Sequence, residues 1–117
     1  MFEKNLNISL LLDFYGEILS ERQKDMLDFY YNDDLSLAEI AHNYDISRQG
    51  VRSVLKKGEN ILMQMEEKLH LAQRFSSVQE KSSQIVVELE KINGLINDDE
   101  VSLKIKSLIE QIKDLAD

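Results

Sequence analysis

The stretch "SLAEIAHNYDISRQGVRSVLKK", residues 36–57, decides the fold of this chain. Its apolar residues are spaced so that two short helices, joined by a turn, cross steeply and bury one small shared core. The residues of this core are Ile40, Tyr44, Ile46, Val51 and Val54, and Ala41 lies where the two helices approach closely. The pattern predicts a helix-turn-helix.

Serines mark the start of both helices. Ser36 stands three residues before Glu39, the capping-box pattern in which each side chain binds the other residue's backbone N–H. Ser47 is placed to cap the second helix. Asp45 lies in the turn between them, and Asp is a residue type that tolerates the left-handed backbone conformation.

The second helix carries the chemistry. Residues 47–57 contain four basic and no acidic residues, and three of the four follow one another at intervals of four. Arg pairs with guanine and Gln with adenine in the major groove, while Lys meets phosphates. We therefore expect nucleic acid to be bound by Ser47, Arg48, Gln49, Arg52, Ser53, Lys56 and Lys57.

The alternative is a helix pair that only builds a core and whose basic row faces solvent. Gly50 favours this alternative, because a glycine near the start of a reading helix loosens it. The charge of the whole chain favours it too: 22 acidic and 14 basic residues give a net charge of −8, and duplex DNA repels an acidic surface. Charges farther away than a Debye length of about 8 Å are screened, however, so the charge of the local patch matters more for DNA binding than the net charge of the chain.

Two helices are expected before the motif. The first has an apolar stripe made of Ile8, Leu11, Leu12, Tyr15, Ile18 and Leu19. Ser20 and Gln23 form a second capping-box pattern, and Met26, Leu27, Tyr30 and Tyr31 continue an apolar face behind it. The clustered aromatic residues are assigned to the core.

The reading helix is expected to run far past its DNA-facing end, because its inner face steps by three and four through Val51, Leu55, Gly58, Leu62, Met65, Leu69 and Ala72. Gly58 weakens a helix by about 1 kcal/mol relative to alanine and permits a kink there. His70, between two leucines, is expected to pack.

Residues 71–117 predict two helices joined by a short turn. Their apolar rows are Val78, Ile85, Leu89 and Ile92, and then Val101, Ile105, Leu108, Ile112 and Leu115. Such rows bury nothing unless they pack within the chain or between chains. We expect a helix-turn-helix domain over 1–70 and a C-terminal helical extension over 71–117 that forms a homodimer, with an intramolecular hairpin as the alternative.

Several classes of protein are not expected. Proline is absent, so an all-α chain follows; cysteine is absent too, and two isolated histidines make no zinc site. No nucleophile, base and orienting residue form a set, so we expect neither an enzyme nor a cofactor. Neither a membrane span nor a signal peptide is expected, and the absence of cysteine fits the cytoplasm.

Residues 18–62 resemble region 4 of bacterial sigma factors, with "SLAEIA", a turn and "SRQ" before a valine. Asp45 stands where that family usually has a turn glycine, and Gly50 where it has alanine. The longer stretch from "LLLDFYGEILSERQ" to "EEKLHL" is similar to the YlxM family, described as DNA-binding proteins associated with the signal recognition particle. The resemblance implies a helical regulator whose partner is DNA, or an accessory factor that contacts the protein or RNA of that particle.

Overall fold

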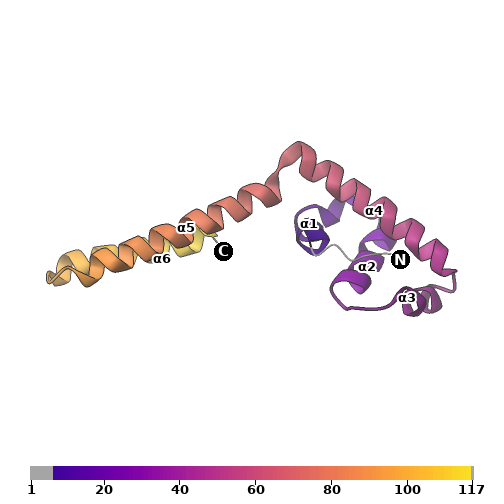
Figure 1. Cartoon of the computed structure of the whole chain (residues 1–117), viewed down its shortest axis with the longest axis horizontal. Helices are drawn as coiled ribbons and strands as arrows, with labels where there is room; N and C mark the ends of the chain where they lie inside the picture. Colours follow the sequence, from indigo (N-terminus) through magenta and orange to yellow (C-terminus); the bar gives the residue numbers. More distant parts are fainter. Residues whose placement is uncertain (1–6, 117) are drawn as a thin grey trace. The chain divides into compact units, whose positions relative to one another are not determined.

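The computed structural model describes residues 7–116, and this part of the chain is all-α, as predicted (Figure 1). The elements are α1 (Asn7–Tyr15), the 3-10 helix η1 (Gly16–Ile18), α2 (Glu21–Tyr31), α3 (Leu37–Tyr44), α4 (Arg48–Leu69), α5 (Leu71–Gly94) and α6 (Asp99–Ala116). The chain divides into two compact units, Met1–Ala72 and Gln73–Asp117.

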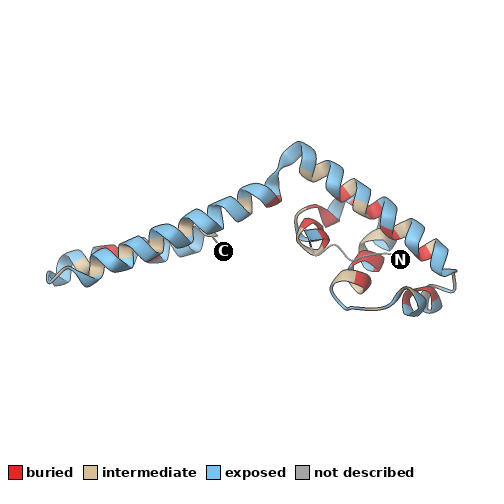
Figure 2. Ribbon diagram, viewed as in Figure 1, coloured by how far each residue is buried: buried red, intermediate tan, exposed pale blue. Residues whose placement is uncertain are grey.

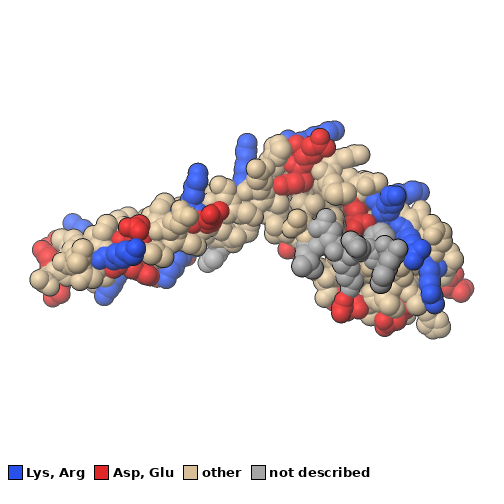
Figure 3. All heavy atoms as spheres, viewed as in Figure 1, with Lys and Arg blue, Asp and Glu red and all other residues tan. Residues whose placement is uncertain are grey.

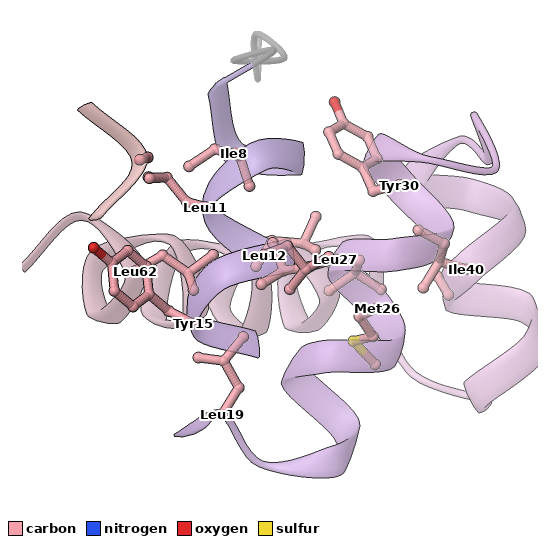
Figure 4. Close-up of a cluster of buried hydrophobic side chains, with 14 residues drawn as sticks. Ile8, Leu11, Leu12, Tyr15, Leu19, Met26, Leu27, Tyr30, Ile40 and Leu62 are labelled. Atoms are coloured by element: carbon pink, nitrogen blue, oxygen red, sulfur yellow. The ribbon is translucent and has the colours of Figure 1, made fainter. Parts of the chain in front are cut away.

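The first unit is built around α4. Helices α1, α2 and α3 all pack on it, and their apolar side chains meet in one core (Figure 4). The side chains buried to less than 2% exposure are Ile8, Met26, Leu27, Ile40, Val51, Leu55 and Leu62. Tyr44, Ile46 and Val54 pack against this core from the helix-turn-helix. The motif is thus part of a larger core, which fixes α3 and α4.

Both predicted capping boxes are confirmed. The Gln23 N–H donates to Ser20 Oγ at 3.2 Å, and the Ser20 N–H donates back to Gln23 Oε1 at 3.1 Å. Ser36 and Glu39 exchange the same two hydrogen bonds, each 3.1 Å long. Helices α2 and α3 therefore begin where the sequence predicts.

The first helix is shorter than predicted. It ends at Tyr15, and η1 follows, closed by a hydrogen bond of 3.1 Å from the Leu19 N–H to the Gly16 carbonyl. Because a 3-10 helix has three residues per turn, the apolar stripe changes direction at this point. Leu19 stays in the core, but Ile18 is 52% exposed, so the prediction that it faces inward is wrong.

Helix α4 is continuous through Gly58, so the predicted weak point is not where the helix breaks. Gly58 is buried where α2 crosses α4, and a Cβ atom built there would lie 2.8 Å from Leu27 Cδ1. The glycine therefore allows a close approach of two helices rather than a bend.

The break comes at His70, whose φ of 56° is left-handed and ends α4. Leu69 is 44% exposed and His70 is exposed too, so the inner face does not include Leu69 and the predicted packing of His70 is wrong. The physical reason is a cluster of hydrogen bonds that binds the first N–H groups of α5, groups that have no partner within their own helix.

This cluster joins Tyr15 of α1 to both sides of the break. The Tyr15 hydroxyl donates to Glu66 Oε1 at 2.6 Å and accepts from the Leu71 N–H at 3.1 Å, and the Ala72 N–H donates to the same Glu66 oxygen at 3.0 Å. Burial, and then the hydrogen bond to Glu66, raise the pKa of the Tyr15 hydroxyl above its ordinary value. We call Tyr15, Glu66, Leu71 and Ala72 the junction cluster.

The second unit is an antiparallel hairpin of α5 and α6. Gln79 of α5 donates to the Ala116 carbonyl at 3.4 Å, and the Ser102 hydroxyl of α6 donates to Asn93 Oδ1 at 2.7 Å. Asp98 caps α6 by accepting from the Glu100 N–H at 2.9 Å. The predicted pair of helices with a short turn is confirmed.

The predicted apolar rows face inward only in part. Ile105 and Ile109 are buried, and Leu89 and Ile112 are half-buried. Six other residues are between 40% and 78% exposed, and they are Val78, Ile85, Ile92, Val101, Leu108 and Leu115. In Figure 2 most of the hairpin is accordingly coloured as exposed.

Candidate nucleic-acid interface

The turn between α3 and α4 holds the motif in one conformation. Asp45 ends α3 in the left-handed region, at φ 53° and ψ 48°, as expected for a residue type that tolerates it. The Ile46 N–H donates to the Ala41 carbonyl at 3.0 Å, and this bond closes the turn. Ser47 then starts α4 by accepting from the Gly50 N–H at 3.0 Å.

A second contact braces α3 from α2. The Arg22 guanidinium lies 5.4 Å from the centre of the Tyr44 ring, within the range of a cation–π interaction. The Phe29 ring meets the same Tyr44 ring edge-on, with the ring centres 6.5 Å apart. These two contacts hold α3 against α2, and α3 in turn packs on α4.

The outer face of α4 carries the residues singled out from the sequence. Arg48, Gln49, Arg52, Ser53, Lys56 and Lys57 are all exposed, whereas Val51 and Leu55 on the opposite side of the helix are buried. In Figure 3, Lys and Arg side chains follow the first half of α4. We call the exposed residues from Arg48 to Lys57 the α4 basic face.

Five of the seven predicted residues surround one shallow hollow of about 480 Å³, lined by Gln49, Arg52, Ser53, Lys56, Lys57 and Asn60. Arg48 is exposed at the start of the helix, outside the lining of this hollow. Ser47 is used differently, because its hydroxyl caps the helix. Ser47 thus holds the start of the helix, and because its hydroxyl oxygen only accepts in the cap, its exposed O–H can still donate to a ligand.

Asn60 was not singled out from the sequence. It lies four residues after Lys56 and therefore on the same side of the helix. Its amide extends the row of hydrogen-bonding groups by one turn. A pattern search that continued the interval of four beyond the basic residues would have found it.

The basic face ends at an acidic residue. Glu59 is half-buried, and the Tyr31 hydroxyl of α2 donates to its Oε1. Burial raises the pKa of the Glu59 carboxyl, and the hydrogen bond from Tyr31 acts in the opposite direction. This pair connects α2 to α4 just beyond the basic residues.

A hollow of opposite character lies on α1, η1 and α2. It has a volume of about 260 Å³ and is lined by Leu12, Asp13, Glu17, Lys24, Asp25, Asp28 and Asn32. Lys24 and Glu17 form an ion pair of 2.5 Å, and the other carboxylates leave this surface acidic. The first unit therefore carries separate basic and acidic surfaces.

Other kinds of site find little support in residues 7–116. No group of three or more His, Asp or Glu side chains in this range could hold a metal ion. Among the described helices, none combines the length and the apolar character that crossing a membrane requires.

Comparisons with known proteins agree with this geometry. The family model UPF0122, described as "Putative helix-turn-helix protein, YlxM / p13 like", matches residues 2–115. A UPF0122 protein of Clostridium kluyveri is 41% identical over 109 residues, which cover 92% of this chain and 96% of that protein. A UPF0122 protein of Listeria monocytogenes serotype 4b is 39% identical over 115 residues, covering 98% and 99%. One from Acetivibrio thermocellus is 38% identical over 113 residues, covering 94% and 97%.

Proposed function

Since the chain belongs to the UPF0122 family of YlxM/p13-like helix-turn-helix proteins, we propose that it binds duplex DNA through the α4 basic face and acts as a non-enzymatic regulator. One observation carries the proposal. The exposed side of the second helix of the motif bears four basic and no acidic residues from Arg48 to Lys57, in a chain whose net charge is −8. The basic residues are thus concentrated on the surface that would face the groove of the DNA.

The residues on this face have separate tasks in the proposal. Arg48, Gln49 and Arg52, in the first two turns of α4, are placed to read base edges, as the start of a reading helix does. Ser53, Lys56 and Lys57 meet the phosphates and set the register. Ser47 holds the start of the helix through its cap. A cytoplasmic location fits this ligand.

The test is a fluorescence-anisotropy titration with duplex DNA from the promoter region of the protein's own gene. Arg52→Glu should weaken binding by about 5- to 150-fold, the equivalent of the 1–3 kcal/mol that a good base contact supplies. Arg74→Glu makes the same change of charge on an exposed residue of α5 and should leave the affinity within about twofold. Equal losses in both variants would show that the net charge matters and the α4 face does not.

A second candidate function is an accessory one in the signal recognition particle pathway, with the helix-turn-helix serving as scaffold. The acidic hollow of α1, η1 and α2 favours it, because Asp13, Asp25 and Asp28 would complement a basic, RNA-binding protein. The double variant Asp25→Lys and Asp28→Lys should then lose the protein component of the particle in a pull-down, while Arg52→Glu retains it. The reverse result, or binding of the particle RNA that depends on Arg52, would assign the contact to α4.

A further inference from the structure

The α5–α6 hairpin leaves an ordered apolar surface without a partner inside the second unit. In each helix three apolar residues follow one another at intervals of seven, which is close to two helical turns. Val78, Ile85 and Ile92 form the row on α5, and Val101, Leu108 and Leu115 form the row on α6. All six are at least 40% exposed.

The two rows lie on the same side of the hairpin. Successive residues of an α-helix are turned by about 100°, and this places each row about 40° to 100° before the residues that mark the contact face of its own helix. Leu89 marks the contact face of α5, and Ile105 and Ile109 mark that of α6. Because the helices are antiparallel, offsets in the same rotational sense in the two helices point to the same side.

The rows are also nearly level with each other. The contacts from Gln79 to Ala116 and from Ser102 to Asn93 fix which residues lie opposite one another. In this register Val78 lies within two residues, about 3 Å along the helix, of the level of Leu115, and the same holds for Ile85 and Leu108 and for Ile92 and Val101. The surface therefore consists of three layers, each with one apolar residue from each helix, and we call it the layered face.

The hairpin buries little by itself. Between Gln73 and Ala116, Ile105 and Ile109 are the only buried apolar residues. Two such side chains do not offset the conformational entropy lost by more than forty residues, about 1 kcal/mol or more for each. The layered face is the part of the core that a partner has to complete.

We propose that the layered face binds the layered face of a second copy of this chain, in a two-fold symmetric four-helix bundle. A closed two-fold contact uses one surface twice, so the surface must complement itself. Three nearly level layers have this property. A two-fold axis in the plane of the face can run along the helices or across them, and in both cases it brings each layer of one copy onto a layer of the other. The residues are the Val, Ile and Leu of bundle cores.

Charge around the layered face also suits a second copy. Lys81 and Glu88 flank the row on α5, and Lys104 flanks the row on α6. A rim that carries both signs of charge can complement itself, because a positive side chain of one copy can face a negative side chain of the other. In the bundle Glu88 of one copy meets Lys81 or Lys104 of the other, depending on the direction of the two-fold axis.

The size of the layered face sets the expected strength. Helix α6 has 18 residues and is therefore about 27 Å long, and two adjacent helices present a width of about 20 Å. Two such faces together remove on the order of 1,000 Å² from solvent, which is near the lower limit for a specific interface. We expect a dimer that forms in the micromolar range.

Sedimentation equilibrium on the full chain at 2 to about 100 μM tests the proposal, with no nucleic acid present, so the result is independent of the proposed function. The native chain and the variants Val87→Glu and Leu103→Glu should dimerise, whereas Ile85→Glu and Leu108→Glu should be monomers. Val87 and Ile85 are matched, since they are 48% and 49% exposed on the same helix. A monomeric native chain, or equal losses in Val87→Glu and Ile85→Glu, would overturn the proposal.

Cross-linking tests the same face without charging it. The sequence contains no cysteine, so single substitutions give unambiguous disulfides. A disulfide in Ile85→Cys alone supports the two-fold axis across the helices, and one between Ile85→Cys and Leu108→Cys chains in a mixture supports the axis along them. Val87→Cys is the control. Cross-linking of Val87→Cys as fast as both, or of none of the three, would overturn the proposal.

Discussion

Gly50 and Gly58 lie in the same helix and have opposite surroundings. A Cβ atom at Gly50 would lie 3.4 Å from both Ile46 Cδ1 and Ser47 Oγ, at ordinary contact distance, whereas one at Gly58 would lie 2.8 Å from the buried Leu27 Cδ1. Sequence alone predicts that both weaken α4. Only the packing of α2 on α4 distinguishes them.

We predict opposite effects of the two alanine substitutions. Gly50→Ala should stabilise the first unit by about 0.5–1 kcal/mol, the difference in helix propensity. Gly58→Ala gains the same propensity but overpacks the α2–α4 contact, which costs about 1–3 kcal/mol, so it should be destabilising overall. Urea denaturation followed by circular dichroism measures both. Stabilisation by Gly58→Ala would show that Leu27 moves aside freely.

Glu59 should make stability depend on pH. Burial raises the pKa of its carboxyl above the ordinary 4.5, so the folded state keeps the proton to higher pH than the unfolded chain does. Its contribution to stability is therefore complete below the unfolded-state pKa and is lost as the pH rises through the folded-state pKa. Glu59→Gln keeps an acceptor for the Tyr31 hydroxyl and removes the ionisation.

The expected result is that Glu59→Gln is more stable than the native chain at pH 7 and no more stable at pH 4, measured as urea midpoints. Glu67→Gln removes an exposed carboxylate from the same helix and serves as the control. An equal gain for Glu59→Gln at both pH values would contradict the assignment, because the effect would then not come from ionisation.

At the scale of the element, helix starts and faces near the motif were predictable, and so was a new helix from residue 71, but the contact that ends α4 at His70 was not. Ser20, Ser36 and Ser47 act through residues three positions away, so short sequence patterns contain them completely. The break at His70 depends on Tyr15, more than fifty residues earlier in the chain, whose hydroxyl binds the first N–H of α5. No local pattern contains that contact.

From the junction cluster we predict that removing the Tyr15 hydroxyl lowers the stability of the first unit. Tyr15→Phe leaves the Leu71 N–H without its acceptor and removes one of the donors to Glu66 Oε1, so it should destabilise the first unit by about 1–3 kcal/mol. Amide hydrogen exchange at Leu71 and Ala72 should also become faster. Tyr44→Phe, which keeps the ring contact with Arg22, is the control. Unchanged exchange at Leu71 would show that α5 starts there for another reason.

The C-terminal rows show a different limit of sequence analysis. Ile105 recurs seven residues later at Ile112, and Leu108 recurs at the same interval in Val101 and Leu115. The interval is the same for a row that faces inward and for a row beside the contact face, so the sequence does not show which of the two rows is buried. From the sequence alone, the hairpin and the dimer are alternatives. In the structure the hairpin buries Ile105 and Ile109 while Leu108 remains exposed, so the two arrangements are compatible.

At the scale of the whole molecule, the distribution of charge matters more than its sum. The net charge of −8 comes with acidic side chains around the α1–α2 hollow and at helix starts, such as Asp98 before α6. The α4 basic face contains no acidic residue from Arg48 to Lys57. The residues of this face were predictable because they lie within ten positions of one another, whereas the fixed support under them comes from α1 and α2.

The most direct test of the central claim is the salt dependence of DNA binding, measured by anisotropy between about 50 and 200 mM salt. If Lys56 meets a phosphate, Lys56→Glu should weaken binding and reduce the slope of log K against log salt by about 1. Lys106→Glu, the same substitution on the exposed side of α6, should leave the slope unchanged. A slope that is the same in the native chain and in Lys56→Glu would contradict DNA binding by the α4 basic face.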